Sequence, residues 1–448
     1  MCEYTEQRGS ARVAPDPPGK PIGREITRRA AEIAPDQGQR VRFRTWQYQN
    51  RAQPVHSAET GPTPWNTAHG SVVSRWQNCW VATIDQIRPT DSCLHVTWDD
   101  GVESWYPWLW LRDHAHDDAT IHPVTQQRRL ETATLPPDLR AASATADNGV
   151  ARITWIGNTE ISEVPVDFLN RFRAPAAARI AATTRPVLWD GASIANAPLR
   201  IDYQRVMASD EGVHQWLSIV ATYGFAIVTG TPASTEATEA LIRRVGYVRE
   251  TIFGGFWEFT ADLSKADLAY TNVHLSSHTD GTYSHDAPGL QMLHCLYFDG
   301  TGGESTLADG FKIAEVLRAT EPELFDVLSS VAIPGQYIGD GAHLMAARPV
   351  FRHDHNGTLV QVSYNNSDRA PFLLPADEMA QLYTALRAFD HLANSESMQW
   401  RQVLRPGDAL LFDNWRALHG RCAYTGKRTM CGAYLNHEDF ESRLRTAG

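Results

Sequence analysis

The chain has 448 residues, 42% of them hydrophobic, which is enough for two or three domains with a large core. Its formal net charge of −11 argues against nucleic acid or an anionic membrane surface as a partner. The six cysteines form no C-x-x-C pair, so neither a disulfide framework nor a thiolate zinc site is indicated. No apolar run could cross a bilayer and no secretory segment is evident, so we expect a soluble, cytoplasmic protein.

Residues 1–65 are predicted to form a disordered tail. They are rich in Pro, Gly, Gln, Arg and acids, and they offer almost no periodic apolar face. The arginines favour a mitochondrial transit peptide, but the five acidic residues between positions 3 and 32 argue against one, because such peptides are poor in acids. Import into the mitochondrial matrix is therefore the alternative to a cytoplasmic location.

Residues 75–172 are predicted to form a small β domain. Its β-rich runs alternate with D-D-G and D-N-G turn signals and lie at 80–84, 94–98 and 151–155. The segment after the second of these runs contains side chains that either hold a metal or are simply solvated. These are His114, His116, Asp117, Asp118 and His122.

Residues 183–448 are predicted to form a second domain, after a linker rich in Ala, Arg and Pro. Asp210 is the expected N-cap of its first helix, which Gly224 ends. Strand patterns alternate with further helices, expected at 236–245, 311–330 and 377–393. Antiparallel strands with helices packed outside indicate a mainly β fold with flanking helices, a jelly-roll barrel whose mouth holds the functional site.

The sequence His278-Thr279-Asp280 places two metal-ligand side chains two residues apart. On an extended segment both project to the same side, because side chains alternate along a strand. With His419 as a remote third ligand, two histidines and one carboxylate would occupy one face of a metal ion, as in non-haem Fe(II) oxygenases. An isolated H-x-D also occurs by chance, so the neighbouring motifs decide between these interpretations.

Five motifs resemble those of one family. They are H-T-D-G-T-Y at 278–283, G-L-Q-M-L-H-C at 289–295, T-G-G-E-S at 301–305, Y-N-N-S-D-R-A at 364–370 and F-D-N-W-R-A-L-H-G-R at 412–421. The chain from about residue 75 onward resembles the Fe(II)/2-oxoglutarate dioxygenases of the taurine dioxygenase superfamily, in the branch of γ-butyrobetaine hydroxylase and trimethyllysine dioxygenase. The resemblance implies a double-stranded β-helix and a small N-terminal β domain.

The resemblance also implies the cofactor sites. His278, Asp280 and His419 would hold Fe(II), which leaves coordination positions for 2-oxoglutarate and O2. Arg428 would bind the distal carboxylate of 2-oxoglutarate, since a guanidinium fork matches a planar carboxylate, and Ser305 would assist it. Ascorbate is a possible supporting reductant.

Aromatic side chains are expected to bind the substrate. A trimethylammonium group has no hydrogen-bond donor, so aromatic faces are its natural partners. By resemblance, Trp257, Tyr270 and Phe253 would form a cage around it, although taken singly each is more often a core residue. Asn366, in the Y-N-N motif, is a further expected substrate contact.

Asp267 favours one substrate of this branch. It stands eleven residues before His278, where γ-butyrobetaine enzymes resemble one another in having an asparagine that meets a carboxylate. An acid there would repel a carboxylate but would pair with the α-ammonium of trimethyllysine. We therefore expect hydroxylation of N6-trimethyl-L-lysine at carbon 3, the first step of carnitine biosynthesis. The alternatives are γ-butyrobetaine or another quaternary amine or amino acid, and, more remotely, a non-catalytic 2-oxoglutarate-binding protein.

The N-terminal domain departs from the family in one motif. The branch commonly holds zinc through cysteines that follow W-L-R-D, but here residues 110–113 are followed by H-A-H-D-D without a cysteine. This difference argues against structural zinc. The resemblance then leaves contacts within a homodimer as the expected role of the domain.

Overall fold

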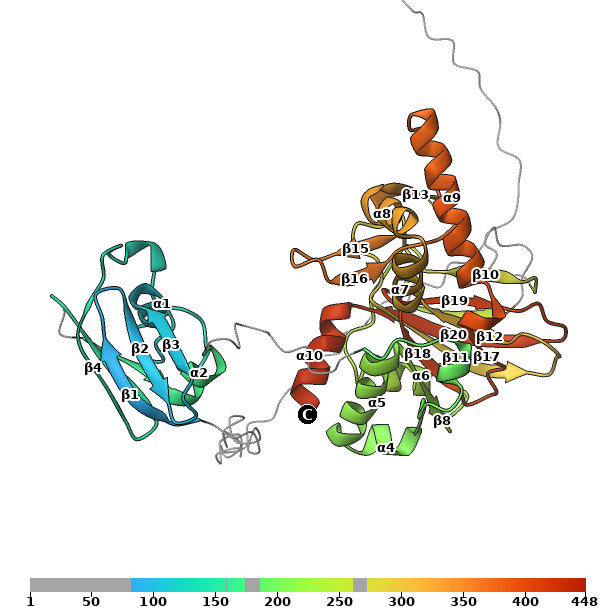
Figure 1. Cartoon of the computed structure of the whole chain (residues 1–448). Coiled ribbons are helices and arrows are strands. Elements are labelled where there is room, and N and C mark those ends of the chain that lie inside the picture. The colour runs from blue at the N-terminus through green and yellow to red at the C-terminus, as the bar shows by residue number, and fades with distance from the viewer. Residues whose placement is uncertain (1–81, 158–159, 174–185, 261–271, 340) are drawn as a thin grey trace, which may run out of the picture. The chain divides into compact units, whose positions relative to one another are not determined.

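The computed structural model describes residues 82–157, 160–173, 186–260, 272–339 and 341–448 (Figure 1). The tail expected at 1–65 lies outside the described residues. Among the described residues, no helix is both long and apolar enough to span a membrane.

Two three-stranded antiparallel sheets, each followed by a short helix, form the part before residue 174. The first contains β1 (Ile84–Pro89), β2 (Cys93–Trp98) and β3 (Glu103–Pro107), followed by α1 (Trp108–Asp113). The second contains β4 (Ala141–Asp147), β5 (Val150–Trp155) and β6 (Ile161–Pro165), followed by α2 (Val166–Arg171), and the one-turn η1 (Thr132–Thr134) lies between the sheets in sequence. The strands expected at 94–98 and 151–155 are confirmed. The strand expected at 80–84 instead begins at Ile84, because residues 84–89 are those that pair with β2.

The two sheets repeat one pattern of side chains. In the first, the indole N–H of Trp98 donates to Ser104 Oγ at 2.9 Å, and in the second Trp155 donates to Ser162 Oγ at 2.9 Å. Each serine lies on the last strand of its sheet, and a proline ends that strand just before the helix. Both tryptophans are buried in one core, so the two halves stabilise each other by apolar burial.

Two larger sheets form the part from residue 186 onward. The six-stranded sheet has the order β7 (Arg200–Asp202), β8 (Phe225–Thr229), β18 (Ala409–Asp413), β11 (Leu290–Phe298), β20 (Arg428–Leu435) and β9 (Phe256–Thr260). The four-stranded sheet has the order β10 (Leu275–His278), β19 (Ala417–Arg421), β12 (Ser305–Asp309) and β17 (Gln399–Gln402). All neighbours are antiparallel except β7 and β8.

The two sheets share one core. Leu307 and Trp400 of the smaller sheet pack in the same buried cluster as Leu410, Phe412 and Met430 of the larger sheet. The sheets therefore face each other, and this part is mainly β with helices outside, as expected.

Helices cover the outer faces of both sheets (Figure 1). The larger sheet is covered by α4 (Tyr203–Ala208), α5 (Asp210–Tyr223), α6 (Thr235–Ile242) and α10 (His437–Ala447). The smaller sheet is covered by α7 (Gly310–Thr320), α8 (Pro322–Ser330) and α9 (Ala376–Ala393). The remaining elements are α3 (Gly191–Ile194), η3 (Glu396–Met398) and two hairpins, β13 (Ile333–Gly339) with β14 (Ala342–Arg348) and β15 (Phe351–His353) with β16 (Leu359–Val362).

Several helix boundaries differ from the expectation, and the helix expected at 236–245 already ends at Ile242. Ser209, not Asp210, is the N-cap of α5, because its hydroxyl accepts from the backbone N–H of Gly212 at 3.1 Å while Asp210 is already helical. The region 311–330 holds two helices rather than a continuous one, because Pro322 lacks an N–H and starts α8.

A buried ion pair joins elements that are far apart in sequence. Arg416 donates to Asp309 through Nη2 at 2.8 Å and through Nε at 3.1 Å, and both side chains are almost fully buried. The same guanidinium donates to the carbonyl oxygens of Val187 and Thr222. The turn between β18 and β19 is thereby held against the start of α7 and the end of α5.

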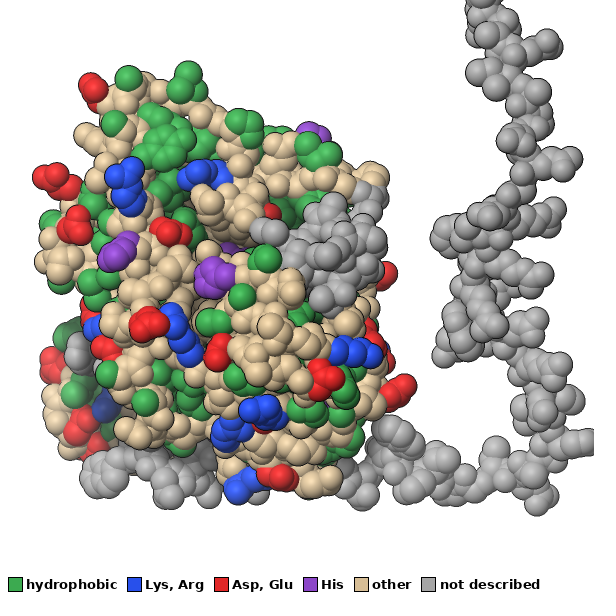
Figure 2. Space-filling model, turned by 90° about the vertical axis from the view of Figure 1, so that its right-hand side faces the viewer, with side chains coloured by type: hydrophobic (Ala, Val, Ile, Leu, Met, Phe, Trp, Pro, Cys, Tyr) green, Lys and Arg blue, Asp and Glu red, His purple; other side chains and the backbone are tan. Residues whose placement is uncertain are grey.

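The part from residue 186 onward carries side chains of both charges on the face shown in Figure 2. Acidic and basic side chains are interspersed there with hydrophobic ones. Among the described residues that this view displays, no extended basic patch is present.

Candidate metal centre

His278, Asp280 and His419 converge at one end of the smaller sheet. His278 ends β10 and lies directly opposite His419 of β19, with ring centroids 4.2 Å apart. One Asp280 oxygen lies 3.4 Å from His278 Nε2, and the other lies 3.6 Å from His419 Nε2. Among the described residues, this is the single group of three such side chains whose ligand atoms all lie within 4.8 Å of one another.

Hydrogen bonding orients the His278 ring for metal binding. His278 Nδ1 lies 2.8 Å from the carbonyl oxygen of Ser276, which can only accept, so Nδ1 carries the proton. The other nitrogen, Nε2, therefore presents its lone pair toward Asp280 when the ring is neutral. A backbone carbonyl that fixes the ring in this way is the usual support of a metal-binding histidine.

The electrostatics of the group suit a cation. Burial raises the pKa of Asp280, but the two adjacent imidazoles outweigh burial and hold that pKa well below its ordinary value. Burial, with the charge of His278, lowers the pKa of His419 to about 3, so its ring is neutral at pH 7. Burial also lowers the pKa of His278, but the Asp280 carboxylate outweighs it and raises that pKa. A divalent ion could replace this proton on His278. Two imidazole nitrogens and one carboxylate are the donor set of non-haem iron sites, so the residues fit the metal.

Two side chains outside the triad hold Asp280 in place. Tyr434 donates its hydroxyl to Asp280 Oδ2 at 2.8 Å. Asn414, which is buried, accepts from the backbone N–H of Asp280 at 2.8 Å and donates to its carbonyl oxygen at 3.1 Å. Neither residue was expected to contribute, although Asn414 stands within the motif at 412–421.

Arg428 and Ser305 both lie buried at the start of a strand of the facing sheets. Ser305 pairs with Arg421 across β12 and β19, and the guanidinium carbons of Arg421 and Arg428 lie 5.0 and 5.8 Å from the ring centroid of Tyr424. Among the described residues, no carboxylate lies within ion-pair distance of Arg428. Burial, with the charge of Arg421, lowers the pKa of Arg428 to about 10. A buried cation in these surroundings suits an anionic ligand.

Trp257 lies next to the candidate metal centre. Its ring meets that of Tyr434 edge-on at 5.7 Å, and Tyr434 in turn binds Asp280. Trp257 pairs across β9 and β20 with Gly432, where a Cβ atom would lie 2.6 Å from the indole and 1.9 Å from the carbonyl oxygen of Met292. Only glycine at this position lets the indole lie against β20.

Phe253 belongs to a second aromatic group. Its ring meets that of Tyr337 on β13 at 5.5 Å, and Tyr337 lies 5.4 Å from Tyr283. Tyr283 stands three residues after Asp280, so this group is connected through the chain to the metal-binding segment. The two other expected substrate contacts, Asp267 and Tyr270, lie outside the described residues.

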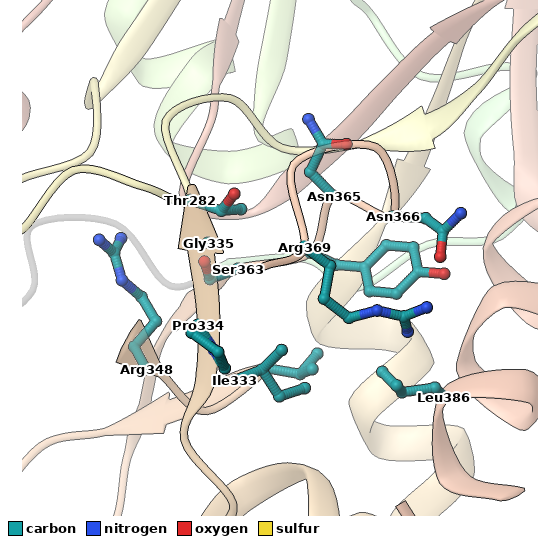
Figure 3. Close-up of a pocket in the computed structure, with 12 residues that line it drawn as sticks. Thr282, Ile333, Pro334, Gly335, Arg348, Ser363, Asn365, Asn366, Arg369 and Leu386 are labelled. Carbon is teal, nitrogen blue, oxygen red and sulfur yellow. The ribbon is translucent and has the colours of Figure 1, made fainter. Parts of the chain in front are cut away.

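Asn366 is exposed and lines a small pocket that is open to solvent (Figure 3). The pocket adjoins the metal-binding segment. Thr279 donates its backbone N–H to the carbonyl of Tyr364 at 2.7 Å, and the Thr279 hydroxyl accepts from the backbone N–H of Tyr364 at 2.9 Å. Both Tyr364 and Thr282 line the pocket.

The histidines and aspartates of the loop near residue 114 make local contacts instead of forming a metal site. His114 stacks on Trp110 at 4.7 Å and its Nδ1 lies 2.8 Å from the Trp110 carbonyl oxygen, while Asp117 accepts from the Thr120 hydroxyl at 2.7 Å. In the described part of the chain, these residues do not gather their ligand atoms around one point. Local packing therefore accounts for the loop.

Comparison with known proteins gives two family matches. Residues 184–434 match the model described as taurine catabolism dioxygenase TauD, TfdA family, and residues 86–162 match that described as gamma-butyrobetaine hydroxylase-like, N-terminal.

Curated relatives match over most of their length. Trimethyllysine dioxygenase of Meyerozyma guilliermondii is 35% identical, with 78% of this chain and 92% of the relative covered. The mitochondrial trimethyllysine dioxygenase of Rattus norvegicus is 33% identical, with 85% and 94% covered. Gamma-butyrobetaine dioxygenase of Pongo abelii is 30% identical, with 81% and 97% covered. A solved taurine dioxygenase from Burkholderia xenovorans is 16% identical with a TM-score of 0.39, and covers 50% of this chain and 80% of that chain.

Proposed function

Because the chain belongs to the taurine catabolism dioxygenase TauD, TfdA family, we propose that it hydroxylates N6-trimethyl-L-lysine at carbon 3, the first step of carnitine biosynthesis. The family and the Fe(II)/2-oxoglutarate dioxygenase class expected from the motifs are confirmed by these matches. The observation that carries the proposal is the convergence of His278, Asp280 and His419 in a chain whose relatives are named trimethyllysine dioxygenase.

The side chains of the candidate metal centre have separate roles in this proposal. His278, Asp280 and His419 hold Fe(II), and Arg428 with Ser305 binds the distal carboxylate of 2-oxoglutarate. Bound Fe(II) with 2-oxoglutarate and O2 supplies the oxidising chemistry, while the protein binds, orients and excludes water. The lack of an acidic partner for Arg428 among the described residues supports its role, since a carboxylate ligand would neutralise it.

The substrate is held at both ends in this proposal. Trp257, Tyr270 and Phe253 surround the trimethylammonium group, and Asp267 pairs with the α-ammonium. The contact of Trp257 with Tyr434, one hydrogen bond from Asp280, supports a position beside the metal. Asn366 is a further polar contact, which its place in the adjoining pocket supports.

The two facing sheets are proposed to form a double-stranded β-helix. Their shared core and the position of the metal ligands at one end of the smaller sheet support this arrangement. A homodimer is proposed as well, to be checked by light scattering of the purified protein. Because rat and human relatives are named as mitochondrial, we propose the mitochondrial matrix, which was the alternative location from the sequence.

The test supplies Fe(II) protein with 2-oxoglutarate, O2 and either trimethyllysine or γ-butyrobetaine, followed by mass spectrometry. We expect trimethyllysine alone to gain one oxygen atom, with succinate formed in step. Oxidation of γ-butyrobetaine instead would refute the substrate. Protein that formed no succinate with any substrate, like a His278→Ala control, would be the non-catalytic 2-oxoglutarate-binding alternative.

A further inference from the structure

Apart from Asn366, the polar residues that line the pocket beside the candidate metal centre have no role in the proposed function. The polar residues of this lining are Thr282, Arg348, Ser363, Asn365, Asn366 and Arg369. Asp368 belongs to the same wall, because it accepts from Asn365 Nδ2 at 2.8 Å and from Thr282 Oγ1 at 3.5 Å. Its carboxylate also contributes to raising the pKa of His278, so this wall lies within electrostatic reach of the metal centre.

Arg348, the last residue of β14, is half-buried in this lining. Its Nη2 nitrogen is buried and has no hydrogen-bond partner among the described residues. No described carboxylate lies within ion-pair distance of it either. Asp286, the acidic group whose charge acts on Arg348, accepts instead from Arg249 at 2.7 Å. A buried donor without an acceptor is costly, and an acceptor supplied by a ligand would satisfy this nitrogen.

Arg348 and Arg369 lie on either side of β13 in the view of Figure 3. The guanidinium of Arg369 lies over the ring of Tyr383, with its central carbon 5.6 Å from the ring centroid, whereas Arg348 has another arginine, Arg352, as an electrostatic neighbour. Burial and this neighbour lower the pKa of Arg348. A bound anion would offset both the burial of Arg348 and its repulsion from Arg352. Arg348 is therefore a stronger candidate than Arg369 for binding an anionic ligand.

We propose that Arg348 binds the α-carboxylate of the amino-acid substrate and that the pocket receives this end of the molecule. The inference rests on the proposed function, because it takes a free amino acid to be the substrate. A guanidinium fork matches a carboxylate with two parallel hydrogen bonds, which suits Arg348 to this end of the substrate.

A carboxylate-binding Arg348 would distinguish free from peptide-bound trimethyllysine. Trimethyllysine within a peptide carries an amide where the free amino acid carries a carboxylate. A neutral amide cannot neutralise a half-buried guanidinium, so peptide-bound trimethyllysine would be disfavoured. Arg348 thereby selects the free amino acid.

The experiment compares trimethyllysine with its α-carboxamide, which keeps both cationic groups. Binding to the anaerobic Fe(II)–2-oxoglutarate protein is measured by calorimetry, and turnover is measured separately by mass spectrometry. The wild type is expected to bind the acid at least about tenfold more tightly than the amide, as for a hydrogen-bonded charge. Arg348→Gln should lose most of this preference, and Arg348→Lys should keep part of it because the charge remains.

Arg352→Gln is the matched control. Arg352 is exposed, lies in the same electrostatic neighbourhood, and has its guanidinium over the ring of Trp415. Arg352→Gln removes one positive charge from the same region, as Arg348→Gln does. If the preference for the acid over the amide depended only on the charge of this region, it would weaken equally in both variants. A preference kept in Arg352→Gln and lost in Arg348→Gln supports direct binding. Should Arg348→Gln fail to fold, Arg348→Lys carries the comparison.

The outcomes separate the inference from the proposed function. Equal affinity of the wild type for acid and amide, or an unchanged preference in Arg348→Gln, would overturn the role of Arg348 even if trimethyllysine were hydroxylated. A preference that depends on Arg348 without any hydroxylated product would uphold the inference and refute the proposed function. A wild type that binds neither compound would refute both.

Discussion

The Asp280 carboxylate depends on neighbours that place its two oxygens. The Tyr434 hydroxyl donates to one of them at 2.8 Å, and the ring of Tyr434 also packs against Trp257. Tyr434→Phe removes the hydrogen bond and keeps the ring. We expect Fe(II) affinity to fall by roughly tenfold to a hundredfold, because hydrogen bonds to a ligating carboxylate orient it. Anaerobic calorimetry of metal binding measures the change.

Tyr297→Phe is the control for this prediction. Tyr297 is exposed, and its hydroxyl donates to Asp299 at 2.8 Å, so the same chemical change is made at another tyrosine–aspartate pair. An equal loss of affinity in both variants, or no loss in Tyr434→Phe, would show that the Tyr434 hydroxyl does not support the metal ligand.

At the scale of residues, the sequence reveals candidate ligands more readily than the residues that support them. His278 and Asp280 stand two apart, and His419 and Arg428 lie in or near recognisable motifs, so all four were predicted. Tyr434 touches Asp280 across 154 positions, and no local pattern marks such a contact. Asn414 is a partial exception among the supports, since a polar residue inside a motif is a signal that could have been used.

At the scale of elements, the buried ion pair of Arg416 and Asp309 connects three segments of the chain. Arg416→Met would leave the buried Asp309 carboxylate without its partner, so we expect the free energy of unfolding to fall by about 3–5 kcal/mol. Chemical denaturation measures this loss. The exposed pair of Arg243 and Glu239, one helical turn apart at 2.6 Å, provides the control. Arg243→Met should cost at most about 1 kcal/mol, and similar losses in the two variants would contradict a special role for the buried pair.

Elements were predicted well where a local pattern exists. The helix over 210–223 has an apolar period and a terminal glycine, and its end at Tyr223 was predicted while its cap was misplaced by one residue. The repeat of two sheets before residue 174 was missed, because its signature is a Trp–Ser hydrogen bond between strands rather than a run of similar residues. The partners of Arg416 were also beyond local patterns, since they are contributed by segments up to 229 positions away.

At the scale of the whole molecule, the order of strands and helices predicts a mainly β fold with helices outside, which the structure bears out. The sequence does not reveal how the C-terminal helix α10 is fixed to them. His437, its first residue, stacks on Trp415 at 4.6 Å and lies between Asp413 Oδ2 at 3.5 Å and Glu441 Oε1 at 3.3 Å. The charged imidazole of His437 therefore attaches the C-terminal helix α10 to the rest of the fold.

This arrangement makes stability depend on pH. Burial lowers the pKa of His437, but Asp413 and Glu441 outweigh it and raise that pKa to about 10. A raised pKa means that protonated His437 stabilises the folded state fully below about pH 6.5, and that this contribution is lost as the pH rises toward 10. Urea unfolding across this range should show a fall of at most about 1.4 kcal/mol per pH unit from this group. His437→Gln should flatten the profile, whereas His391→Gln, at an exposed position of α9, should not. If His437→Gln kept the slope of the wild type, the imidazole would not be the group that fastens α10.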